Sequence, residues 1–92
     1  MVQALVLINA ERGSVPRTAE RLLEIKEVTE VFSVTGEYDL VAMVRLKEYE
    51  DLARVVTEEL ALIDTITKTE TMLAFKVYSR ADLEQSWEIG VE

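Results

Sequence analysis

The sequence at residues 31–44 reads VFSVTGEYDLVAMV. Two apolar runs flank a short polar turn with the pattern Gly-x-x-Asp, which is formed by Gly36 and Asp39. Runs rich in Val and Phe on either side of a glycine-containing turn are typical of a β-hairpin. We therefore expect strands at Glu30 to Thr35 and at Asp39 to Leu46, paired antiparallel with the motif at their tip.

Hydrophobic periodicity before this hairpin predicts one strand and one helix. Val2 to Ala10 is apolar, rich in Val, Ile and Leu, and too short for a typical helix, so it is expected to be a strand. Ser14 can cap a helix and Pro16 is tolerated in its first turn. Apolar residues then recur at helical spacing, which predicts a helix over Val15 to Val28.

After the hairpin, the pattern predicts a second helix and a last strand. From Glu48 onward a stripe with a period of 3.6 residues comprises Tyr49, Leu52, Ala53, Val56, Leu60 and Ile63. Threonines at alternate positions and an apolar run predict a strand over about Ile66 to Tyr78. A capping-box pattern at residues 79–82 predicts a short terminal helix over Ala81 to Trp87.

The expected element order is βαββαβ, which is the ferredoxin-like motif of the α+β class. It consists of an antiparallel four-stranded sheet with two helices on one face. A chain of 92 residues is the size of one domain. We assign residues 1–79 to this domain and residues 80–92 to a C-terminal extension that packs on it.

The strands do not alternate between apolar and polar residues, as strands with one wet face should. Ala4 to Ile8, Leu40 to Val44 and Met72 to Phe75 are apolar at odd and even positions alike. The helices can cover only one face of the sheet, so a homodimer that stacks two sheets, as in a dimeric α/β barrel, is expected. The alternative is that the segment around Trp87 folds back as a lid.

Composition excludes several classes of function. The chain has 18 acidic and 10 basic residues, and its net charge of −8 should repel nucleic acid. It has no His and no Cys, which removes disulfides, common zinc sites and most nucleophile–base pairs, so no metal or cofactor is expected. The apolar N-terminal run is too short to span a membrane, which points to a cytoplasmic protein.

The sequence resembles the effector-binding RAM domain of the Lrp/AsnC, or feast/famine, family of regulators. The resemblance rests on EVTEV at residues 27–31, VTGEYD at 34–39, a strand ending in Val44-Arg45, and TET at 69–71. It implies dimers that join through their sheets and assemble into rings, with amino-acid effectors bound where dimers meet. The chain resembles a stand-alone member that lacks the DNA-binding helix-turn-helix domain.

The candidate ligand site combines the hairpin tip with the threonines of the last strand, whose hydroxyls we expect to reach the ligand from a neighbouring dimer. A glycine can expose backbone amides to a ligand carboxylate, and an aspartate can pair with its ammonium group. The candidate residues are Gly36, Glu37, Tyr38, Asp39, Thr67, Thr69 and Thr71. The alternatives are that Gly36 only shapes the turn, that Asp39 only bonds to nearby backbone amides, and that the threonines are ordinary strand residues.

These patterns predict a non-enzymatic amino-acid sensor that changes its assembly, or its contact with another protein, when ligand binds. A full-length Lrp/AsnC relative is one expected partner. Two alternatives stay open. In the first, the chain is a purely structural oligomerisation module with a vestigial site. In the second, it is a cofactor-free enzyme of the dimeric α/β-barrel type.

Overall fold

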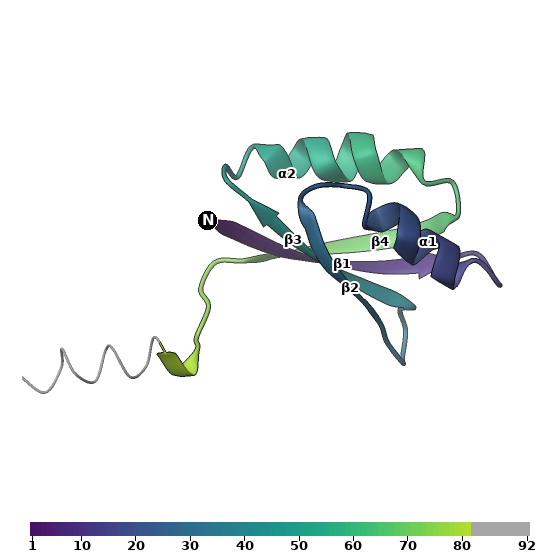
Figure 1. The fold of residues 1–92 in the computed structure, drawn as a ribbon, viewed down its shortest axis with the longest axis horizontal. Helices are drawn as coiled ribbons and strands as arrows, with labels where there is room; N and C mark the ends of the chain where they lie inside the picture. Colours follow the sequence, from purple (N-terminus) through teal and green to yellow (C-terminus); the bar gives the residue numbers. More distant parts are fainter. Residues whose placement is uncertain (82–92) are drawn as a thin grey trace, which may run out of the picture.

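The computed structural model describes residues 1–81 (Figure 1). The elements in chain order are β1 (Val2–Ala10), α1 (Val15–Leu22), β2 (Val28–Ser33), β3 (Leu40–Leu46), α2 (Asp51–Arg54), η1 (Val55–Glu59), η2 (Leu60–Leu62) and β4 (Ile66–Ala74). The strands form one antiparallel sheet in the order β2-β3-β1-β4, and both helical segments lie over the same face. The predicted ferredoxin-like architecture is therefore confirmed.

The core lies between the sheet and the helices, because every second residue of the central strands points toward them. Ala4, Val6 and Ile8 of β1 are completely buried there. The other buried apolar residues are Leu22, Ile25, Val28, Leu40, Ala42, Val44, Leu46, Val55, Leu60 and Ile63. Burial of this set on one side of the sheet fixes which residues face the other side.

The opposite side of the sheet, here called the open face, is also apolar at its centre. The strand register places Leu5 between Met43 and Met72, and it pairs Val41 with both Leu7 and Phe32. Phe32 and Met72 are 46% and 44% exposed. The sequence pattern was therefore right that apolar residues occupy both faces of the sheet.

The first helix is shorter than predicted and ends at Leu22 rather than Val28. The chain continues in tight turns, in which the N–H of Ile25 donates to the carbonyl of Leu22 and the N–H of Val28 to that of Ile25. These turns keep Ile25 in the core, so the apolar spacing persists although the helix has ended. As a result β2 starts at Val28, two residues before the predicted strand, and ends at Ser33.

The second helical segment begins at Asp51 and changes its winding at η1, where a π-type turn accommodates an extra residue. The residues that face the sheet differ from the predicted stripe. Val55 is completely buried, whereas Tyr49 and Ala53, which were expected in the apolar stripe, are exposed. The predicted helix was right, but its buried face differs at these positions.

The last strand ends at Ala74 rather than Tyr78, because Ala74 pairs with Gln3, beside the beginning of β1. Beyond this point β1 offers no partner. The following residues lead away from the sheet in Figure 1, and Phe75 is 98% exposed. The predicted terminal helix and the lid around Trp87 lie almost wholly outside the described residues, which include only Ala81 of that segment.

Candidate functional site: the hairpin tip and β4

The β2–β3 connection exposes the Gly-x-x-Asp motif at the edge of the sheet. The turn is closed by a hydrogen bond of 3.0 Å from the N–H of Val34 to the carbonyl of Asp39. Gly36 has a φ of +109°, and a Cβ added there would meet no atom within 4 Å. Glycine is therefore required by the backbone conformation and not by crowding, and its exposed backbone is accessible to another molecule.

Asp39 connects the tip to the central strand. Its Oδ2 accepts a hydrogen bond of 3.0 Å from the N–H of Ala10, and its own N–H donates to the carbonyl of Ile8. The turn-stabilising role that the sequence left open is thus present. Within residues 1–81 the second carboxylate oxygen, Oδ1, makes no hydrogen bond, so the side chain retains an acceptor and a negative charge at a half-buried position.

Tyr38 reaches from the tip to β4. Its hydroxyl donates to Oε1 of Glu70 at 3.0 Å, and Nζ of Lys68 lies 5.4 Å from the centroid of its ring. Lys68 and Glu70 are opposite Asn9 and Leu7 of β1, so this contact bridges the central strand. Sequence reasoning missed both residues, although they alternate with the three candidate threonines along the strand.

The three candidate threonines line cavities on the helix side of the sheet, and one of them also contacts the backbone of β1. Thr67 donates to the carbonyl of Asn9 at 3.2 Å, and with Thr69 it lines a cavity beneath η2. Thr71 lines an apolar groove between β4 and the second helical segment, together with Tyr49, Leu52, Ala53 and Val56. The sheet therefore separates Thr69 and Thr71 from the contact between Tyr38 and Glu70, and the predicted residues do not converge in a single cavity of one chain.

A buried hydroxyl cluster holds α1 against the turn before β4. The side chain of Thr18 is completely buried, donates to the carbonyl of Ser14 at 2.8 Å, and lies 2.6 Å from the hydroxyl of Thr65. The N–H of Glu11 donates to the carbonyl of Thr65 at 2.8 Å. These bonds fix the end of β1 that carries Asn9 and Ala10, and so position the hairpin tip and Thr67.

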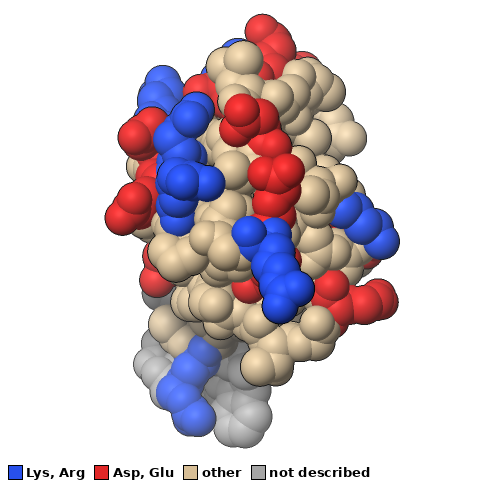
Figure 2. All heavy atoms as spheres, turned by 90° about the vertical axis from the view of Figure 1, so that its right-hand side faces the viewer, with Lys and Arg blue, Asp and Glu red and all other residues tan. Residues whose placement is uncertain are grey.

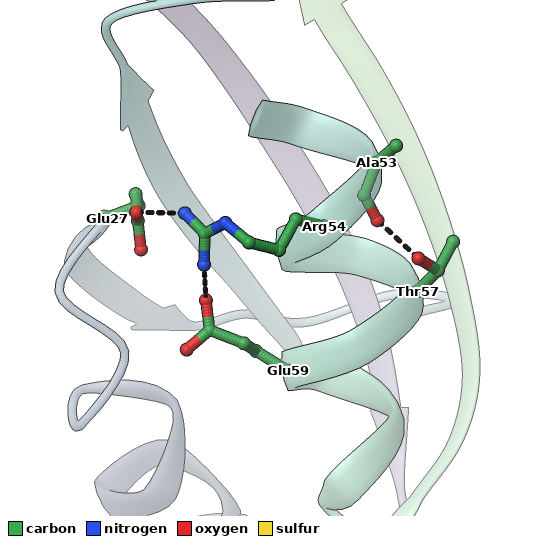
Figure 3. A network of polar contacts seen from close by, with 5 residues as sticks. All are labelled: Glu27, Ala53, Arg54, Thr57 and Glu59. Carbon is green, nitrogen blue, oxygen red and sulfur yellow. Dashed lines mark hydrogen bonds and ion pairs between the residues drawn. The ribbon is translucent and has the colours of Figure 1, made fainter. Parts of the chain in front are cut away.

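A second polar network lies at the other end of the fold (Figure 3). Arg54 forms ion pairs with Glu27 and Glu59 and thereby connects the second helical segment to the loop before β2. Burial alone would raise the pKa of Glu27, but hydrogen bonds from Arg54 and from its own backbone, with the nearby positive charges, lower the pKa below its usual value. Glu27 therefore remains ionised although it is buried.

The charged surface is mixed on the side of the molecule that lies to the right in Figure 1. Figure 2 shows basic side chains standing between acidic ones there, without a continuous basic area. None of the helices in residues 1–81 is long and apolar enough to cross a membrane. The same residues contain no group of three or more acidic side chains arranged to hold a metal ion.

Comparison with known proteins identifies a family. The model of the Lrp/AsnC ligand binding domain matches residues 3–83. The HTH-type transcriptional regulator FL11 of Pyrococcus furiosus is 31% identical over 77 residues, which are 84% of this chain and 50% of that protein. The chain thus spans about half the length of the curated relatives it matches.

The fold of this chain is also similar to that of solved structures. The structure of TTHA0845 from Thermus thermophilus has a TM-score of 0.81 and 46% identity, and the match covers 87% of this chain and all of that one. AsnC of E. coli has a TM-score of 0.79 and 25% identity over 85% of this chain and 53% of its own.

Proposed function

The chain belongs to the Lrp/AsnC ligand-binding domain family, and we propose that it binds a small amino acid at an interface between dimers and thereby changes its assembly. The observation that carries this proposal is the exposed hairpin tip, where Gly36 presents its backbone and Asp39 keeps one carboxylate oxygen without a hydrogen bond inside residues 1–81. Backbone amides suit a carboxylate and the aspartate suits an ammonium group. Among the remaining proposed contacts, Glu37 and Tyr38 belong to this tip. Thr67, Thr69 and Thr71 come from a neighbouring chain.

The open face supports dimer formation. Its apolar centre would be covered by the same surface of a second copy in a two-fold arrangement. A stable interface of this kind typically removes about 800 Å² per partner from water. Dimers provide the units between which a shared ligand site can form.

Similar proteins support an amino acid as the ligand and regulation as the role. The regulator NMB0573 from Neisseria meningitidis, which shares the fold at a TM-score of 0.76 but only 16% identity, was crystallised as a complex with L-Met. Curated relatives are named as transcriptional regulators, which favours a regulatory role over an enzymatic one. We propose that the output is a change of assembly or of contact with another protein, such as a longer relative, without direct binding to nucleic acid.

The structural-module alternative also has support, because Asp39 already holds the hairpin to Ala10. The variant Asp39→Asn separates the two functions, since an amide oxygen can still accept the bond from Ala10 while the charge is lost. The matched control is Glu20→Gln, which removes a charge from an exposed residue of α1 that is not among the candidate site residues.

The experiment measures thermal unfolding and molar mass with a panel of amino acids at millimolar concentration. A ligand of the folded assembly raises the melting temperature of the wild type and of Glu20→Gln by mass action, and Asp39→Asn loses the response. If no amino acid shifts the melting temperature of the wild type, the sensor proposal is wrong. A response that persists in Asp39→Asn would remove the aspartate from the site.

A further inference from the structure

A cavity of about 360 Å³ lies at the end of the sheet where β1 begins and β3 ends. The hairpin tip is at the opposite end, where Asp39 contacts Ala10 at the close of β1. The charged residues that line the cavity are Lys26, Glu27, Arg45, Lys47, Asp51 and Arg54. It is therefore separate from the proposed amino-acid site and does not depend on that proposal.

More basic than acidic residues line the cavity, although the whole chain is acidic. Four of the 10 basic residues line it, although the chain carries a net charge of −8. Arg54 is already paired with Glu27 and Glu59. Lys26, Arg45 and Lys47 form no ion pair within residues 1–81, and Lys26 acts on Glu27 only as a nearby charge. Asp51 is the only other acidic residue of the lining, so positive charge is in excess.

The elements around the cavity are held together by contacts that do not involve the side chains of Lys26, Arg45 and Lys47. The N–H of Arg45 donates to the carbonyl of Glu27 at 2.9 Å, which joins β3 to the loop that carries Lys26. Figure 3 shows how Arg54 connects the same loop to the second helical segment through Glu27. The ion pair holds one side of the cavity, and Lys26, Arg45 and Lys47 form no ion pair within residues 1–81.

We propose that this cavity is a second binding site, which takes a small, multiply charged anion such as an organic phosphate or a polycarboxylate. Arginine binds either group through its fork of N–H donors, and lysine adds point charges. The excess of positive charge favours ligands with several negative charges over singly charged ones. A volume near the lower end of the usual range for ligand pockets favours a small molecule.

The test measures the binding of pyrophosphate and of citrate by isothermal titration calorimetry, with ionic strength held constant by added sodium chloride. The variant Arg45→Gln/Lys47→Gln removes two cations from the cavity. Its control, Arg12→Gln/Arg17→Gln, removes two exposed cations that form no ion pair within residues 1–81 and do not line the cavity. Sedimentation at the same concentrations is needed, because the register places Arg45 on the open face opposite Gln3.

We expect the wild type to bind at least one of the two anions saturably, and the preferred anion identifies the ligand class. The cavity variant should raise the dissociation constant about tenfold or more, and the control variant less than twofold. Absence of saturable binding to both anions would overturn the proposal, and so would an equal loss in the two variants. A cavity variant that loses oligomers and shows no separate loss of anion affinity would identify the patch as an interface between copies instead.

Discussion

Replacing Phe32 by Ala tests whether the open face is an interface. Full burial of a phenylalanine side chain is worth about 3 kcal/mol. Phe32 is 46% exposed in the single chain, so about half of this amount, ~1.4 kcal/mol, is left to be gained on association. A two-fold dimer contains the residue twice, and the loss of ~2.8 kcal/mol should raise the dimer dissociation constant about a hundredfold.

Sedimentation velocity over a dilution series measures this constant for the wild type, for Phe32→Ala and for the control Leu62→Ala. Leu62 is 74% exposed and lies on η2, on the other side of the sheet from the open face. The control should dissociate like the wild type. Equal dissociation constants for the wild type and Phe32→Ala, or a wild type that remains monomeric at every concentration, would refute the reasoning.

Three further predictions concern the elements that position the proposed sites. Thr18→Val should lower the free energy of unfolding by about 1 kcal/mol in a urea titration, because it removes the buried hydroxyl that bonds to the carbonyl of Ser14 and leaves the half-buried hydroxyl of Thr65 without its 2.6 Å partner. Glu27 has a folded pKa below its ordinary value of 4.5, so its stabilising effect is complete above that pH and is lost as the pH falls through the lowered pKa. Glu27→Gln should therefore reduce the acid dependence of stability below pH 4.5, and an unchanged dependence would contradict this. Gly36→Ala should cost about 1 kcal/mol in thermal unfolding through its φ of +109° alone, since a Cβ there meets no neighbour; a neutral result would show that the turn relaxes.

The sequence predicted the sheet well because the strands are strongly apolar and the turns between them are polar. The limits of β1 were predicted to the residue, at Val2 and Ala10. The ends of α1 and β4 were missed because they depend on other parts of the chain. Helix α1 ends in turns that keep Ile25 in the core, and β4 ends where β1 no longer offers a partner for Ala74. Neither constraint is visible in local periodicity.

The candidate ligand contacts remain a prediction, and the faces of the sheet on which they lie were not predicted. Alternate residues of a strand point to opposite faces. Glu70 alternates with the period-two threonines and so lies on the opposite face, where its carboxylate accepts a hydrogen bond from Tyr38. What the pattern could not supply is the register between β1 and β4, which brings Tyr38 across the central strand.

The separation of the candidate residues by the sheet constrains any assembly in which they share a ligand. Thr69 and Thr71 open toward the helix side of β4, whereas the tip at Gly36 extends beyond the opposite pair of strands. A ligand that touches both sets must therefore take them from different chains. Such a contact joins two unlike surfaces, the tip of one chain and the β4 edge of another, so it is heterologous and continues until it closes into a ring or extends as a filament. The ring of dimers that the resemblance to the Lrp/AsnC family implies is one of the two assemblies that this geometry allows.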